Sequence, residues 1–173
     1  DIIPADIDET AMISRLRGQD PAEIARALAN EKALAVALDH PDAVVIGADQ
    51  ILEQDGDLLQ KASDRNEAAK KLRHLSGRTH RLISAVVVAR GGQTLWQATS
   101  DAKLAMRALG DEELEAYLDK AGAALTRSVG AYELEGIGTG LFEKIDGDYF
   151  TILGLPLIPL LGYLREHYNI TGF

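Results

Sequence analysis

The spacing of hydrophobic and polar residues predicts a long helix in the first quarter of the chain. Between Pro21 and Leu38 apolar residues recur at helical intervals, and Asp20 precedes them as a residue suited to capping a helix. The apolar side of this helix is predicted to consist of Ile24, Leu28, Leu34, Ala35 and Leu38. Lys32 falls on the same side, and we interpret its aliphatic stem as passing along the edge of the core so that the amine reaches water.

The pattern then changes to a short unbroken apolar run in residues 43–48, AVVIGA. Such a run, rich in β-branched residues, is typical of a strand that is covered on both faces. It ends on Asp49 and Gln50. In open α/β sheets ligands gather beyond the carboxyl ends of strands, which makes Asp49 a candidate for ligand contact. A turn capped by the Asp49 carboxylate explains the same residue equally well, so both interpretations stay open.

The rest of the chain alternates between helix signals and strand signals. A capped helix is predicted from Ser63 or Asp64 to a stop at Gly77, and a long hairpin is predicted around Gly91 and Gly92. The other predicted elements are a turn and short extended piece over 55–61, a helix over 110–122, a strand over 141–145 and a helical segment over 155–168. Because crossover helices and a hairpin occur together, we predict an α/β fold with helices around one mixed sheet of parallel and antiparallel pairs.

Composition narrows the classes of function. The 173 residues are 46% hydrophobic and 26% charged, which is the balance of a globular chain forming a single domain over residues 1–173. No apolar run reaches the roughly 18 residues that a membrane helix needs, so no membrane partner is predicted. The net charge of -9 argues against a nucleic-acid partner, since backbone binding relies on Lys and Arg. The absence of cysteine excludes disulfides and thiol nucleophiles.

Carboxylates and lysines supply the candidate chemistry. The acidic candidates are Asp6, Asp8, Glu9, Asp49, Glu133 and Glu135. Two or three of these converging on one pocket would give oxygen ligands for Mg²⁺ or Mn²⁺. Lys32 and Lys61 could then face phosphates. Spacing nominates this site without establishing it, because each charge alone is also compatible with a solvated surface.

The glycines at 136, 138 and 140 fit neither common nucleotide-binding loop. The pattern GxGxxG would require glycine in place of Leu141, and GK followed by Ser or Thr occurs nowhere in the chain. We interpret these glycines as a tight turn that leads into an edge strand.

Seven short motifs occur in order along the chain: DIDE, ALANEKA, VVIGADQIL, the lysine at 61, LSGRTH, GAYELEGIG and GLPLIPLL. Together they resemble the Maf family of nucleotide pyrophosphatases, and the resemblance runs from about Ile2 to Leu164. It implies an elongated mixed sheet flanked by helices, like that of the inosine triphosphatases (Maf/Ham1-like), with two lobes around a cleft. It also implies hydrolysis of a nucleoside triphosphate between the α and β phosphates, to a monophosphate and pyrophosphate.

The resemblance extends to cofactor, partners and role. It implies dependence on a divalent cation (Mg²⁺, Mn²⁺ or Co²⁺), a cytoplasmic location and a homodimer. The family is thought to remove modified nucleotides and so to prevent their incorporation into nucleic acids. Some members are linked to septum formation and cell-division arrest.

The family's functional residues carry over to four charged positions. By resemblance, Asp49 is the proton acceptor for the attacking water and binds the metal together with Glu9. Lys32 matches the lysine of the family's EKA motif. Lys61 matches that of its GKP loop, which reads QKA in this chain. Both lysines suit a reaction in which catalysis consists mostly of positioning and of neutralising charge on phosphate oxygens.

Two further positions are candidates for recognising the nucleobase of the substrate. Gln50 and Glu135 look like the family branch that acts on 7-methyl-GTP, because a carboxylate accepts from guanine N–H groups and attracts a methylated, positively charged purine. The family's opening strand and SxSPRR loop do not occur in the sequence. We expect them in a segment that precedes Asp1. Without them, the alternative is a nucleotide-binding regulator of septum formation or cell division with little or no turnover.

Overall fold

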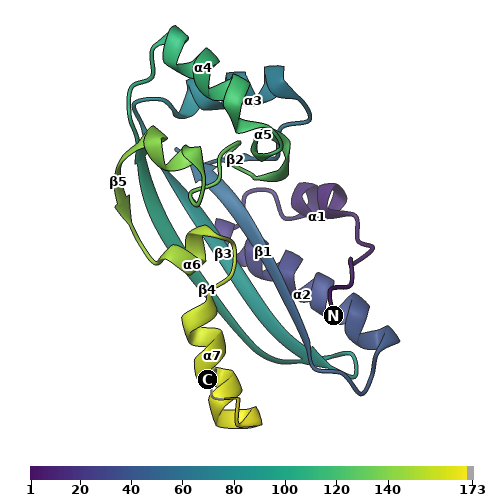
Figure 1. Cartoon of the computed structure of the whole chain (residues 1–173). Coiled ribbons are helices and arrows are strands. Elements are labelled where there is room, and N and C mark those ends of the chain that lie inside the picture. The colour runs from purple at the N-terminus through teal and green to yellow at the C-terminus, as the bar shows by residue number, and fades with distance from the viewer. Residues whose placement is uncertain (171–173) are drawn as a thin grey trace. The chain divides into compact units, whose positions relative to one another are not determined.

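The computed structural model describes residues 1–170 as two compact units (Figure 1). The first unit comprises residues 1–50, 83–100 and 154–170. The second unit comprises residues 51–82 and 101–153. Each unit has its own apolar core.

Five strands form one antiparallel sheet in the order β2-β1-β3-β4-β5. Their bounds are β1 Val45–Gln54, β2 Asp57–Leu59, β3 Thr79–Arg90, β4 Gln93–Met106 and β5 Phe142–Asp146. The predicted hairpin is confirmed, since β3 and β4 flank Gly91 and Gly92, both at positive φ. The prediction of an edge strand after the glycine-rich turn is also confirmed, because β5 is the last strand of the sheet.

The prediction of parallel pairs is corrected for these five strands. Helix α3, Arg65–Leu75, connects β2 to β3 and would be the crossover helix of a parallel pair. In the sheet, however, β1 lies between β2 and β3. The strands that the helix connects therefore run in the same direction without being neighbours. A helical connection indicates the direction of the second strand but not its place in the sheet, so the local pattern could not show this.

The longer helices lie where the sequence predicts them, whereas the shorter ones over 9–15, 124–127, 137–141 and 149–152 were not predicted. The first unit contains α1 Glu9–Arg15, α2 Pro21–Asp39 and α7 Leu157–Tyr168. The second contains α3, α4 Asp111–Ala121, α5 Ala124–Arg127, the 3₁₀ helix η1 Ile137–Leu141 and α6 Tyr149–Ile152. The predicted caps are confirmed: Asp20 accepts from the backbone N of α2 at 2.7 Å, and Asp64 accepts from that of α3 at 2.8 Å. Within residues 1–170, no helix combines the length and apolar character needed to cross a membrane.

The buried side of α2 differs from the predicted one. It consists of Ile24, Ala25, Leu28, Ala29, Ala33 and Ala37. Leu38, predicted to be buried, is 68% exposed. The buried alanines follow from close packing on β1, since a Cβ at Gly47 would lie only 2.5 Å from the Ala29 carbonyl oxygen. Small side chains let the helix approach the strand, so alanines occupy much of the contact.

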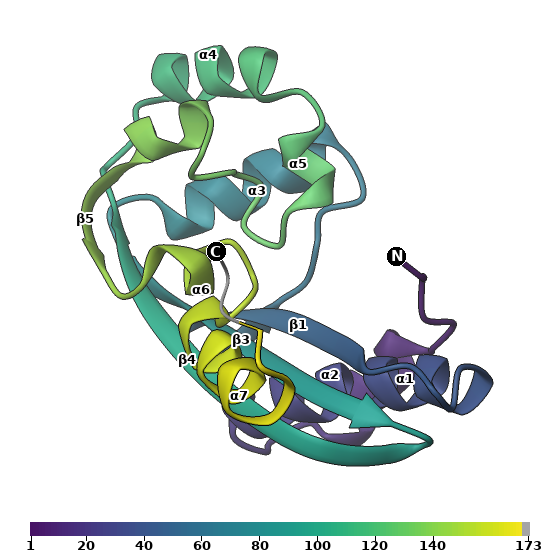
Figure 2. The same ribbon diagram turned by 60° about the horizontal axis from the view of Figure 1, so that its bottom comes forward.

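Helices α2 and α7 cover opposite faces of the sheet in the first unit (Figure 2). Leu160 and Leu164 of α7 pack with Val86 and Val88 of β3. Side chains two residues apart in a strand share a face, so α7 packs on this face of β3. Helix α2 packs on the face of β1 that carries Gly47.

Candidate functional site

Three charged side chains from three elements of the first unit meet at one point. The Lys32 ammonium on α2 lies 2.5 Å from Asp49 Oδ1 on β1 and 2.8 Å from Glu9 Oε1 on α1. The Asp49 side chain is only 8% exposed, whereas that of Glu9 is half exposed. We call Glu9, Lys32 and Asp49 the carboxylate–lysine cluster. It brings together three residues for which the resemblance implies a role.

The packing of α2 on β1 explains why Lys32 reaches Asp49. Gly47 and Asp49 project to the same face of β1, because they are two residues apart. The missing side chain at Gly47 lets Ala29 and Ala33 lie directly against the strand. Lys32 precedes Ala33 on the helix, and its amine reaches the carboxylate two residues beyond the glycine.

The short helix α1 supplies the second carboxylate of the cluster. Glu9 is its first residue. Asp8 caps this helix by accepting a hydrogen bond from Ala11 N at 2.9 Å. The structure therefore gives Asp8 a capping contact and leaves Glu9 to face Lys32.

The electrostatics of the cluster favour a permanently charged lysine. Burial lowers the pKa of Lys32, but hydrogen bonds to Asp49 and Glu9 outweigh it and raise the pKa above its ordinary value of 10.5. The interpretation of Lys32 as a side chain passing the core edge toward water is thereby corrected. Its amine is held between two carboxylates, and its side chain is 24% exposed.

Gln50 lies beside the cluster but projects to the opposite face of β1. Its Nε2 donates to Ser84 Oγ on β3 at 3.0 Å, and a Cβ at Gly154 would lie 4.0 Å from its amide. In the described register β2 pairs only with the last three residues of β1, beyond Gln50. A ligand lying along this edge of β1 could meet side chains from both faces. The contact with Ser84 was not predicted, because a lone hydroxyl in an apolar strand carries no local signal.

Lys61 and Glu135 belong to the second unit. Lys61 is exposed after β2, and Glu135 is exposed in the loop before η1. Glu133, in the same loop, forms an ion pair with Arg127 at 2.7 Å. The roles of Lys61 and Glu135 stay predictions.

The donor set of the cluster suits a hard cation. Within residues 1–170, no group of three or more His, Asp or Glu side chains is arranged to hold a metal. Glu9 and Asp49 do converge on one positive group, the Lys32 ammonium. Mg²⁺ usually keeps several waters and takes one or two protein carboxylates together with substrate phosphates. Two carboxylates therefore fit Mg²⁺ bound with its substrate better than a cage built from protein alone.

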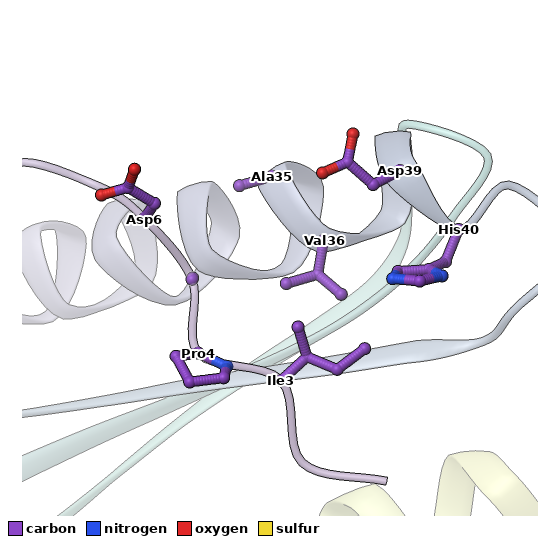
Figure 3. Close-up of a pocket in the computed structure, with 8 residues that line it drawn as sticks. Ile3, Pro4, Asp6, Ala35, Val36, Asp39 and His40 are labelled. Atoms are coloured by element: carbon purple, nitrogen blue, oxygen red, sulfur yellow. The ribbon is translucent and has the colours of Figure 1, made fainter.

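A separate pocket of about 180 Å³ lies between residues 3–6 and the end of α2 (Figure 3). It is lined by Ile3, Pro4, Ala5, Asp6, Ala35, Val36, Asp39 and His40. Figure 3 shows Ile3 near Val36, with the carboxylates of Asp6 and Asp39 pointing away from them. None of the cluster residues lines this pocket. Its volume is below the roughly 300–1,000 Å³ of typical ligand sites, so it does not suit a nucleotide.

Comparison with known proteins places these observations in a family context. A family model described as a Maf-like protein matches residues 1–167. The chain is 53% identical over 166 residues to a nucleoside triphosphate pyrophosphatase of Rhodopseudomonas palustris (strain HaA2), covering 96% of the chain and 82% of that relative. Proteins of the same description from Bradyrhizobium diazoefficiens and Maricaulis maris are 50% and 44% identical over 95% and 96% of the chain, and the matches cover 81% and 85% of those relatives.

Proposed function

The chain belongs to the Maf family, and from this premise we propose that it hydrolyses a nucleoside triphosphate between the α and β phosphates. The products are a nucleoside monophosphate and pyrophosphate. The carboxylate–lysine cluster carries the proposal, because it joins an aspartate, a second carboxylate and a lysine at 2.5 and 2.8 Å. Hydrolysis of a phosphoanhydride bond uses all three groups: a proton acceptor for water, an oxygen ligand for a cation, and a positive charge near the phosphate oxygens.

Asp49 is the proton acceptor in this proposal. The attacking water forms a bond to phosphorus and loses a proton to an Asp49 carboxylate oxygen, while the bridging phosphoanhydride bond breaks. The Asp49 side chain is 8% exposed and fixed by Lys32, so its oxygen is oriented before substrate binds. The ammonium also stabilises the negative charge that Asp49 needs in order to act as a base.

Glu9 and Asp49 are the residues that would hold a divalent cation. When bound, Mg²⁺, Mn²⁺ or Co²⁺ polarises phosphate oxygens and lowers the pKa of water. Lys32 can stay charged beside the phosphates, since its pKa is raised above 10.5. Lys61 is proposed to contribute a second positive charge toward the phosphates.

We propose 7-methyl-GTP as the preferred substrate. Glu135 can accept hydrogen bonds from guanine N–H groups and attract the positive charge of the methylated ring. Gln50 can read the base edge with an amide whose orientation is set by Ser84. The corresponding role is removal of modified nucleotides before they enter nucleic acids, in a cytoplasmic protein that forms a homodimer.

Pyrophosphate release from a panel of triphosphates tests the proposal. The panel contains 7-methyl-GTP, GTP, TTP and UTP, each with Mg²⁺, Mn²⁺ or Co²⁺. We expect pyrophosphate from the unmodified chain, most rapidly from 7-methyl-GTP. We expect Asp49→Asn to lower kcat about 100-fold or more, the usual contribution of a positioned base.

Asp42→Asn is the matched control, because Asp42 is an exposed aspartate just before β1. It should leave kcat unchanged. Release of inorganic phosphate without pyrophosphate would overturn the bond assignment. Nucleotide binding without turnover would favour the regulatory alternative.

A further inference from the structure

Lys71 lies on the core-facing side of α3, where an apolar residue is expected. Helical residues three and four positions apart share a face, and Lys71 follows Ala68 by three positions and precedes Leu75 by four. Both neighbours are fully buried. The adjacent Lys70 is exposed. A lysine on a buried face needs specific partners for its ammonium.

Those partners are two backbone carbonyls from separate segments. The Lys71 ammonium donates to Val129 O at 2.8 Å and also to Gln60 O. Gln60 follows β2, and Val129 follows α5, so both carbonyls lie outside helices and strands. An ammonium has three donors and can satisfy both. Burial lowers the pKa of Lys71 to about 8, against the opposing charge of Glu67, and hydrogen bonds of a partly desolvated ammonium are strong.

Both of these segments lead to residues with a proposed role in substrate binding. Lys61 directly follows Gln60, and Glu135 lies in the loop that continues from Val129. One side chain therefore connects the backbone of the phosphate-facing lysine with that of the base-reading loop. All of these residues belong to the second unit.

We propose that Lys71 is a positioning residue that holds two segments at a fixed spacing, so that both can contact the same substrate molecule. These are the Lys61 segment, residues 60–62, and the Glu135 loop, residues 129–136. The inference rests on the proposed function of Lys61 and Glu135. Lys71 acts through the two carbonyls and does not itself contact the nucleotide. Its removal frees both segments to move apart, which weakens substrate binding more than the proton transfer assigned to Asp49.

Other contacts keep the loop folded when Lys71 is replaced. Arg127 pairs with Glu133 at 2.7 Å, and the Tyr117 hydroxyl donates to Ala131 O at 3.0 Å. Neither contact involves the Gln60 segment. Loss of Lys71 should therefore loosen the spacing of the two segments without unfolding the loop.

Kinetics of three variants test the inference. Lys71→Met keeps the apolar stem and removes the donors, and it should raise KM for the triphosphate about tenfold while kcat changes less than about threefold. Lys71→Arg retains charge and several donors, and it should restore most of the lost affinity. Lys70→Met is the matched control on the exposed side of α3, and its KM should equal that of the unmodified chain.

Hydrogen exchange gives a readout that does not depend on activity. In Lys71→Met, amides of residues 61–62 and 131–136 should exchange about tenfold faster, whereas those of α4 should not change. If Lys71→Met does not fold, Lys71→Gln provides the same comparison. Unchanged KM and unchanged exchange would overturn the role of Lys71. Absence of turnover in the unmodified chain would instead refute the proposed function, and the exchange result would still decide the spacing.

Discussion

Lys32 and Asp49 depend on each other because neither charge is well solvated. We predict that Lys32→Met lowers the free energy of unfolding by about 3 kcal/mol, the cost of leaving a buried carboxylate without its cation. Adding Asp49→Asn to this variant removes the buried negative charge and should recover part of the loss. Urea unfolding of the single and double variants measures both effects. Arg26→Met, a control on the same helix, should cost less than about 1 kcal/mol because the Arg26 pair with Glu23 is local and more exposed.

His80 is a buried imidazole whose protonation destabilises the folded chain. Burial lowers the pKa of His80 to about 4 from 6.5, and its Nε2 lies 2.5 Å from the Tyr132 hydroxyl. Burial also raises the pKa of Tyr132, so the hydroxyl keeps its proton and can donate to Nε2 only while the ring is neutral. Between pH 6.5 and 4 the unfolded chain binds more protons at this position than the folded chain. Stability therefore falls as the pH falls through this window.

The expected loss from His80 is about 3 kcal/mol across the window, from the size of its pKa shift. Denaturation in urea at several pH values checks this, with His80→Gln as the variant that no longer titrates. The free energy of unfolding of the unmodified chain minus that of His80→Gln, taken at each pH, should give the contribution of His80. His74→Gln, at an exposed position on α3, should keep the original profile. Equal profiles for His80→Gln and the unmodified chain would contradict the prediction.

At the scale of elements, the contact between α2 and β1 couples stability to the site. A Cβ at Gly47 would meet Ala29 O at 2.5 Å and the Ala33 Cβ at 2.8 Å. We predict that Gly47→Ala costs about 1–3 kcal/mol by overpacking and also lowers pyrophosphate release, because it pushes Lys32 away from Asp49. Gly162→Ala in α7 is the control, since nothing lies within 4 Å of its added Cβ. A stable Gly47→Ala variant with full activity would show that the contact does not position the cluster.

The ends of the long helices and of the β3–β4 hairpin could be predicted because their signals are local. Asp20, Asp64 and the Gly91-Gly92 pair mark the ends of helices and strands through contacts within a few residues. The end of β1 was predicted wrongly: the apolar run stops before Asp49, but the strand continues to Gln54. The buried side of α2 could not be predicted, because it depends on a glycine in a strand that follows the helix. The sheet order could not be predicted either, since the helix after β2 gives no information about the strand that lies between β2 and β3.

The candidate site was predictable in its residues but not in its contacts. Seven motifs identified the family and the pyrophosphatase class, and both are confirmed by the comparisons. The ion pairs of Lys32 and the bond from Gln50 to Ser84 join positions 17 to 34 residues apart, so no local pattern reveals them. Lys71 could have been noticed as a cation on an apolar helix face, but its carbonyl partners are visible only in the folded chain.

At the scale of the whole molecule, three strands connect the two units. Each of β1, β3 and β4 begins in one unit and ends in the other. Unfolding of one unit therefore disrupts strands that also contribute residues to the other unit. We predict that the chain unfolds as a single domain in one cooperative transition. The chain's single tryptophan, Trp96, stacks on Tyr163 at 4.9 Å and reports on the first unit. The NMR signals of the backbone amides of α4 report on the second unit.

Urea titrations followed by Trp96 fluorescence and by α4 amide signals should give the same midpoint. Leu114→Ala sharpens the comparison, because Leu114 is 2% exposed in the core of the second unit and its truncation should cost about 2–5 kcal/mol. In a cooperative chain this variant lowers the midpoint of the Trp96 signal as much as that of the α4 signals. A shift confined to α4 would mean that the units unfold independently, and a defect in the second unit would then leave the carboxylate–lysine cluster folded.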